Sequence, residues 1–172
     1  MEILNNPSRD TWDALTERNI PNDAAIEESV REIVATIKAQ GDEALRTYAR
    51  KFDGAEITEI EISEAERQAA TAKVAENVKR AIATAAKNIA AFHAAQRPAP
   101  VEVETAKGVC CYQRAVPIQR VGLYIPGGQA PLFSTVLMLG LPARIAGCKE
   151  VVLCTPQGHD GEVAPEIIYA AN

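Results

Sequence analysis

A short apolar segment that ends in a glycine loop constrains the fold of this chain more than any other feature. Residues 121–125 read Val-Gly-Leu-Tyr-Ile and stop at Pro-Gly-Gly over 126–128. An apolar stretch long enough for a buried helix follows over 132–146, and a second short apolar run occupies 151–155. Buried parallel strands read as continuous apolar runs and need a crossover, usually a helix, between them. With a further helix over 164–171, this order predicts the start of a doubly wound parallel sheet in an α/β fold.

The residues before this segment differ from it in composition. Residues 120–172 hold only 7 of the 41 charged residues but 7 of the 10 glycines. A shift of this kind marks a candidate domain boundary. We therefore expect an N-terminal region over 1–119 that belongs to a first domain, and the start of a second domain over 120–172.

The N-terminal region is predicted to be mainly helical. Apolar residues at three- and four-residue steps predict helices over about 24–39 and 43–52. Ser63-Glu64-Ala65-Glu66 is typical of a capping box, and the alanine-rich segment after it predicts helix to about Ala95 with a break near Ala75. Alternating residues on both sides of Lys107-Gly108 predict a β-hairpin, and isoleucines at 57, 60 and 62 predict a short edge strand.

The charge distribution argues against nucleic-acid and membrane partners. The net charge is −5, and the basic residues are scattered among acidic ones, so we expect no nucleic-acid partner. The first ten residues lack the apolar core of a signal peptide, and no run approaches the length of a membrane span. We expect a cytoplasmic protein without a membrane partner.

The cysteines and histidines form no recognisable metal or catalytic pattern. The cysteines are too sparse for a disulfide framework, and the adjacent pair lacks C-x-x-C spacing, so we predict reduced, buried thiols. Two isolated histidines, His93 and His159, do not make a zinc site. We therefore expect neither a catalytic residue nor a metal ligand in this chain. The four cysteines are Cys110, Cys111, Cys148 and Cys154.

The candidate binding site lies where the predicted parallel strands end. In open α/β sheets a ligand binds beyond the carboxyl ends of the strands, which places Thr155 and Pro156 beside the residues that end the first strand. Glycines let backbone N–H groups approach an anion, and a helix that starts nearby adds a partial positive charge. The pattern is neither G-x-G-x-x-G nor a P-loop, so on its own it leaves a ligand loop and a simple tight turn equally open. The candidate residues of the first loop are Tyr124, Pro126, Gly127 and Gly128.

The segment from Val121 to Met138 closely resembles the histidinol dehydrogenase family. It reads VGLYIPGGQAPLFSTVLM, and the likeness continues through PARIAGCK over 142–149 and VVLC over 151–154. Upstream it includes GDEAL over 41–45, KFD over 51–53, Asn88-Ile89 and His93. The resemblance therefore covers nearly the whole chain.

This resemblance implies a specific activity and fold. Members of the family are zinc-containing homodimers that oxidise L-histidinol through L-histidinal to L-histidine with two NAD, in histidine biosynthesis. The tyrosine that matches Tyr124 contacts NAD, and the loop that matches residues 126–128 lies beside it. The fold has two Rossmann-like domains in an aldehyde-dehydrogenase-like architecture, and both would be incomplete here.

The resemblance also implies that much of the enzyme is missing from these residues. Family chains are more than twice as long, and their acid/base pair and zinc ligands come from later segments. We therefore expect an N-terminal fragment that is inactive alone. Two alternatives stay open: a non-catalytic nucleotide-binding or interaction module, and an aldehyde-type dehydrogenase, which would need a nucleophilic cysteine such as Cys148 or Cys154.

Overall fold

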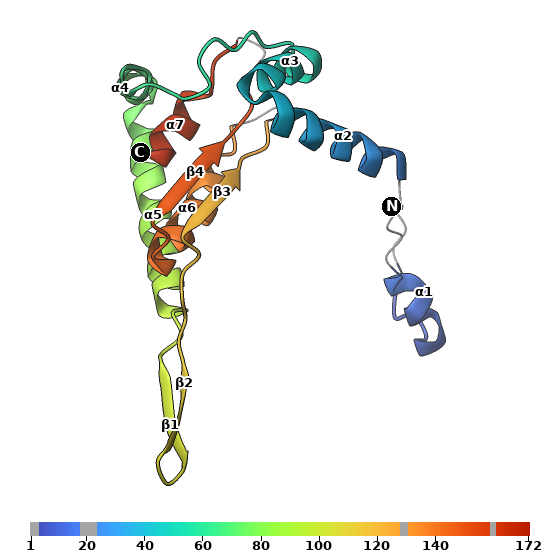
Figure 1. The fold of residues 1–172 in the computed structure, drawn as a ribbon, viewed down its shortest axis with the longest axis vertical. Helices are drawn as coiled ribbons and strands as arrows, with labels where there is room; N and C mark the ends of the chain where they lie inside the picture. The colour runs from blue at the N-terminus through green and yellow to red at the C-terminus, as the bar shows by residue number, and fades with distance from the viewer. Residues whose placement is uncertain (1–3, 18–23, 128–130, 159–160) are drawn as a thin grey trace. The chain divides into compact units, whose positions relative to one another are not determined.

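The computed structural model describes residues 4–17, 24–127, 131–158 and 161–172 (Figure 1). Its residue contacts divide the chain into two compact units, Met1–Ala44 and Leu45–Asn172. The predicted boundary between 119 and 120 concerns the domains of a longer chain, and it stays a prediction.

The described part of the first unit consists of two short helical segments and one longer helix, with little buried surface. A 3-10 turn at Arg9–Thr11 leads into α1 (Trp12–Thr16), and α2 spans Ala24–Gln40, close to the predicted 24–39. Gly41 ends α2 with a left-handed φ of 59°, a conformation that glycine adopts without strain. The helix α2 has no buried residue, and its apolar side chains Ile26 and Val30 are exposed.

The helices of the second unit follow the predicted pattern closely. The helix α3 spans Asp42–Asp53, so its first three residues belong to the first unit, and Gly54 follows it. The helix α4 (Glu64–Lys73) opens with the predicted capping box: Glu66 N–H donates to Ser63 Oγ, and Ser63 N–H donates to a Glu66 carboxylate oxygen. The chain then leaves the helical conformation at Val74 and Ala75 before α5 (Glu76–Ala95), so the predicted break is confirmed.

The edge strand predicted from the three isoleucines Ile57, Ile60 and Ile62 is wrong. This segment forms bends, and the two sheets of the described chain do not include it. Side chains of α3 bind it instead. Arg46 donates to the carbonyl oxygen of Thr58, and Arg50 forms an ion pair with Glu56 at 2.7 Å. The isoleucine spacing indicated β structure, but among the described residues no strand lies alongside to accept a ladder of backbone hydrogen bonds.

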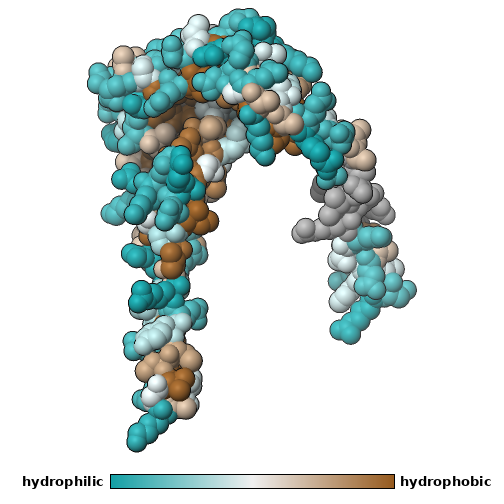
Figure 2. Space-filling view, in the orientation of Figure 1, coloured by the Kyte–Doolittle hydropathy of each residue, from teal (hydrophilic) through white to brown (hydrophobic). Residues whose placement is uncertain are grey.

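The predicted hairpin is present and stands apart from the core. Antiparallel strands β1 (Val101–Ala106) and β2 (Val109–Gln113) pair Val103 with Cys111, and Gly108 takes a left-handed φ of 82° in the turn. Every residue of both strands is exposed, and Figure 2 shows hydrophobic residues at the surface there. The principal packing partner of each strand is the other one.

The core lies around the second pair of strands. Parallel strands β3 (Arg120–Tyr124) and β4 (Glu150–Cys154) are joined through α6 (Phe133–Ala146), and α7 (Pro165–Ala171) follows. The helix α6 packs on α5 and α7 (Figure 1). Ile125, Val136 and Ile167 form the buried cluster, with Phe133 and Leu153 packed against it. The structure is therefore of mixed α/β class, and the predicted strand, helix, strand and helix are confirmed.

None of the described helices is long and apolar enough to cross a membrane.

Candidate functional site

The carboxyl ends of β3 and β4 lie side by side and send their two loops out at one edge of the sheet. The parallel register aligns Tyr124 with Cys154, and Ile125 N–H donates to the carbonyl oxygen of Cys154 at 2.9 Å. This hydrogen bond holds the start of the first loop against the second strand. The predicted convergence of the two loops is therefore present.

The two faces of this small sheet differ in how they are covered. Leu123 and Leu153 are half-buried on the face that α6 and α7 cover, and Ile125, next on the same side, is fully buried. Because side chains alternate along a strand, Tyr124 and Cys154 belong to the opposite face, and both are exposed. The Tyr124 side chain, at 64% exposure, is open to a ligand at this edge.

The two loops approach each other closely at Gly127 and Pro156. A Cβ atom placed on Gly127 would lie only 2.6 Å from Pro156 Cγ. Pro126 and Gly127 are otherwise exposed. Of the predicted site residues, the structure thus brings together Tyr124, Pro126, Gly127 and Pro156. Gly128 lies outside the described residues, and so does His159.

Unpaired polar groups flank this contact. The side-chain oxygens Oγ1 of Thr155 and Oε1 of Gln157 are buried and have no hydrogen-bond partner. The helix α6, which begins just after the first loop, has Leu132 at its N-cap and no side-chain capping hydrogen bond. Buried polar groups usually find partners, so these two oxygens are unusual. The N-terminal turn of α6, which lacks a side-chain cap, favours an anionic group. Gln157 is a residue that sequence reasoning missed, although its polar loop directly after an apolar strand was a signal.

The site residues do not fit a metal ion. Within the described ranges, no group of three or more His, Cys, Asp or Glu side chains could hold one. His93 lies in the last turn of α5, with its ring edge-on to Phe92 at 5.6 Å.

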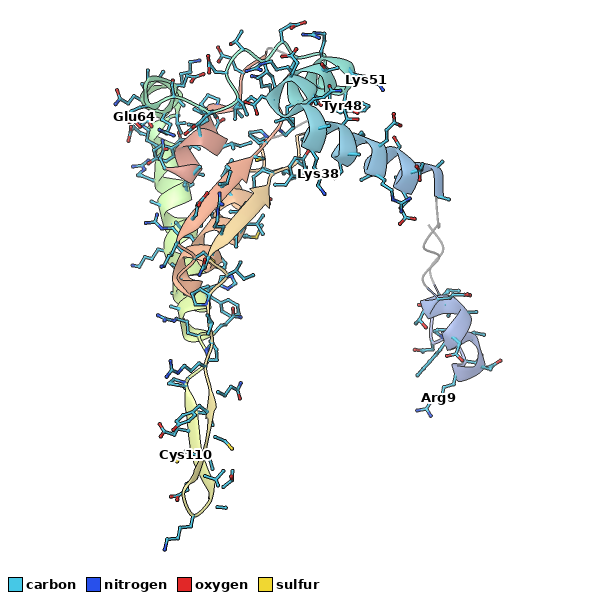
Figure 3. The ribbon with its side chains drawn as sticks, in the orientation of Figure 1. Arg9, Lys38, Tyr48, Lys51, Glu64 and Cys110 are labelled. Atoms are coloured by element: carbon cyan, nitrogen blue, oxygen red, sulfur yellow. The ribbon has the colours of Figure 1, made fainter. Side chains whose placement is uncertain are left out.

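The prediction that the four thiols are buried is wrong. Cys110, Cys111 and Cys154 are exposed, Cys148 is half-buried, and all four are free thiols. Figure 3 shows Cys110 on the hairpin. The cause is structural: none of the described residues forms a layer over the hairpin, and Cys154 belongs to the face of the β3–β4 sheet that the described helices leave open.

A hollow lies at the end of the strands opposite to the two site loops. It has a volume of about 600 Å³ and lies between the C-terminal ends of α5 and α6 and the segments next to the hairpin. Arg97, Arg114 and His93 contribute cationic or polar groups to an otherwise largely apolar wall. The ion pair between Arg120 and Glu150, at 2.8 Å, joins the amino ends of β3 and β4.

Comparisons with known proteins give one consistent result. The family model described as histidinol dehydrogenase matches residues 16–172. Histidinol dehydrogenase from Bacteroides fragilis is 46% identical over 171 residues, which is 99% of this chain and 40% of that protein. The protein of the same name from Escherichia coli strain K12 is 52% identical over 147 residues, 86% of this chain and 33% of its own length.

A solved structure agrees with these relatives. The crystal structure of histidinol dehydrogenase from Elizabethkingia anophelis superposes with a TM-score of 0.89 at 45% sequence identity, covering 97% of this chain and 39% of that one. The chain thus spans 40% or less of the length of these relatives. A match over most of the chain at this identity leaves one assignment, and the chain belongs to the histidinol dehydrogenase family.

Proposed function

We propose that this chain forms the beginning of the NAD-binding site of a histidinol dehydrogenase. The complete enzyme would oxidise L-histidinol through L-histidinal to L-histidine in histidine biosynthesis, with two NAD. The observation that carries the proposal is the convergence of Tyr124, Gly127 and Pro156 at the carboxyl edge of two parallel strands, which is where such sheets bind ligands. Bound NAD would supply the hydride acceptor.

Each residue of the edge has a physical task in this proposal. The exposed ring of Tyr124 offers a flat surface to one side of the cofactor. Gly127 carries no side chain, so the backbone comes close to the ligand, and the N-terminal turn of α6 favours an anionic group such as a pyrophosphate. The buried, unpaired oxygens of Thr155 and Gln157 are acceptors that ribose hydroxyl groups would complement if the second loop opened on binding.

The remaining chemistry is proposed to reside outside these residues. The acid/base pair and the zinc ligands would come from segments that this chain does not contain, and we assign no catalytic residue here. The described part of the chain is expected to be one incomplete Rossmann-like domain followed by the start of a second, in an aldehyde-dehydrogenase-like architecture. We expect the complete enzyme to be a cytoplasmic homodimer and these 172 residues alone to be inactive.

The two alternative functions are less well supported. A stand-alone binding or interaction module does not account for relatives named histidinol dehydrogenase that match 99% of the chain. An aldehyde-type dehydrogenase would need an activated thiol. Cys154 is exposed, yet the family match assigns the chain to a different group of dehydrogenases.

Calorimetric titration of the 172-residue chain with NAD tests the proposal. Tyr124→Ala should abolish binding, whereas Tyr112→Ala should leave it unchanged. Tyr112 is a matched control because it lies on the hairpin and its exposure, 65%, is nearly that of Tyr124 at 64%. Equal losses in both variants would contradict a site at Tyr124. Histidinol turnover is assayed in parallel, and any turnover by this chain would overturn the assignment of the catalytic groups to other segments.

A further inference from the structure

The closest approach between the two site loops involves a glycine whose backbone does not require glycine. The Cβ of an alanine at position 127 would lie 2.6 Å from Pro156 Cγ, below the 3.0 Å that real Cβ contacts respect. Yet Gly127 is not among the glycines with a left-handed φ, which are Gly41, Gly54, Gly108, Gly147 and Gly161. The proline ring, and not the backbone conformation, therefore excludes a side chain at position 127.

The Pro156 ring is held rigidly in place and cannot move aside for a side chain at position 127. The ring closes onto the backbone nitrogen, so proline has no freely rotating side chain. The residue before a proline is also restricted to extended conformations, which limits Thr155. Because Thr155 directly follows β4, the position of the ring is set by the strand itself.

We infer that Pro156 is a positioning residue that sets the distance between the two loops of the nucleotide edge and thereby restricts position 127 to glycine. This inference rests on the proposed NAD site. Pro156 acts through Gly127 and the first loop, without itself holding the nucleotide. Thr155 and Gln157 are the direct chain neighbours of Pro156, so the contact at the ring also fixes where their backbone lies relative to the first loop.

A double-mutant cycle tests this inference directly. The four proteins are the wild type, Gly127→Ala, Pro156→Ala and the double variant. Gly127→Ala should weaken NAD binding roughly tenfold, the effect of inserting one methyl group into a packed contact. Pro156→Ala removes Cγ and Cδ, and the Cβ that stays would be 3.7 Å from the new methyl group, an ordinary contact. The double variant should therefore recover most of the lost affinity.

Gly140→Ala is the matched control. Gly140 lies in α6, and a Cβ placed there would meet no atom within 4 Å. This variant should bind NAD as the wild type does. A Gly127→Ala protein with unchanged affinity, or a double variant that does not recover, would overturn the inference.

Urea unfolding of the same four proteins separates failure of the inference from failure of the proposed function. If the wild type does not bind NAD, the proposed function fails for these 172 residues alone, because they do not suffice to form the site. The inferred contact between Pro156 and position 127 still predicts that Gly127→Ala loses stability and that the double variant regains it. The two positions are in contact, so their effects on stability are not additive. Strictly additive effects on unfolding would overturn the inference.

Discussion

The β1–β2 hairpin and the β3–β4 sheet contain the same number of strands, yet they differ in almost every other respect. The hairpin is antiparallel, continuous in sequence and exposed along its whole length. The β3–β4 pair is parallel, interrupted by a helix, and covered on one face by a buried cluster that includes Ile125. The comparison shows that backbone pairing alone does not bury a strand. A two-stranded ribbon needs a helix or another layer on one face to become stable in water.

Native-state hydrogen exchange gives the largest expected contrast between the two regions. Backbone amides of β3 and β4 should exchange about a thousandfold more slowly than those of β1 and β2, because the hairpin opens without disrupting a core. Exchange followed by NMR, residue by residue, measures this difference. Equal protection in both strand pairs would break the comparison and would indicate that another layer covers the hairpin in solution.

Truncation of Ile125 should give the next largest effect. Ile125 is fully buried at 0% exposure, so Ile125→Ala should lower the free energy of unfolding by about 3 kcal/mol. The control is Ile118→Ala, in the segment between the hairpin and β3, where the side chain is 69% exposed. That variant should change the free energy by less than about 0.5 kcal/mol. Urea denaturation measures both, and similar losses would mean that the core does not centre on Ile125.

Removal of the α4 cap should have a smaller effect. Ser63→Ala deletes the hydroxyl that accepts the Glu66 N–H at 3.2 Å, and the loss should be about 1 kcal/mol of stability. Ser134→Ala is the control, because Ser134 lies inside the first turn of α6 and is not its N-cap. If both variants lose the same stability, the capping hydrogen bond of α4 does not contribute to the free energy of unfolding beyond the effect of removing a serine hydroxyl.

The capping box also predicts a pH dependence, the smallest effect of the series. Hydrogen bonds from the Ser63 hydroxyl and backbone N–H lower the pKa of Glu66 below its ordinary value. Because this pKa is lower in the folded state, the ionised Glu66 carboxylate stabilises the fold at pH values above the ordinary glutamate pKa. This stabilisation is lost as the pH falls through the lowered pKa. The stability gap between wild type and Ser63→Ala should therefore narrow in acid. A gap that is constant from neutral to acidic pH would contradict this origin.

Local patterns predicted the elements whose stability is mostly local. The helices α2 to α5, the capping box at Ser63 and the turn at Gly108 all follow from side-chain spacing and turn chemistry within a few residues. The isoleucine segment at 57–62 was predicted wrongly because a strand depends on a partner that the local sequence does not specify. The thiols were predicted to be buried from composition, but burial depends on which layers are present.

The site could be predicted in outline only. The order of apolar runs located Tyr124 and Gly127 at the end of a strand, and the topology rule placed Pro156 beside them. The contact between Gly127 and Pro156 joins two loops that are 29 residues apart in the sequence, so it depends on the path of both loops. The unpaired oxygen of Gln157 likewise depends on the path of the second loop. No local pattern encodes such a distance.

The crossover helix α6 has a consequence for which changes in chain length the molecule can accept. Its 14 residues span about 21 Å, somewhat more than the roughly 17 Å of a five-residue strand, so it returns the chain to the start of β4. Deleting one residue from α6 would rotate the residues after the deletion by about 100° about the helix axis relative to those before it. Either Val136 would then leave the buried cluster or the helix end at Gly147 would be displaced. The length of the turn at Lys107-Gly108 does not set the position of any element of the core, because the turn joins only the two hairpin strands. Natural insertions and deletions should therefore accumulate at the hairpin tip and be absent from the crossover.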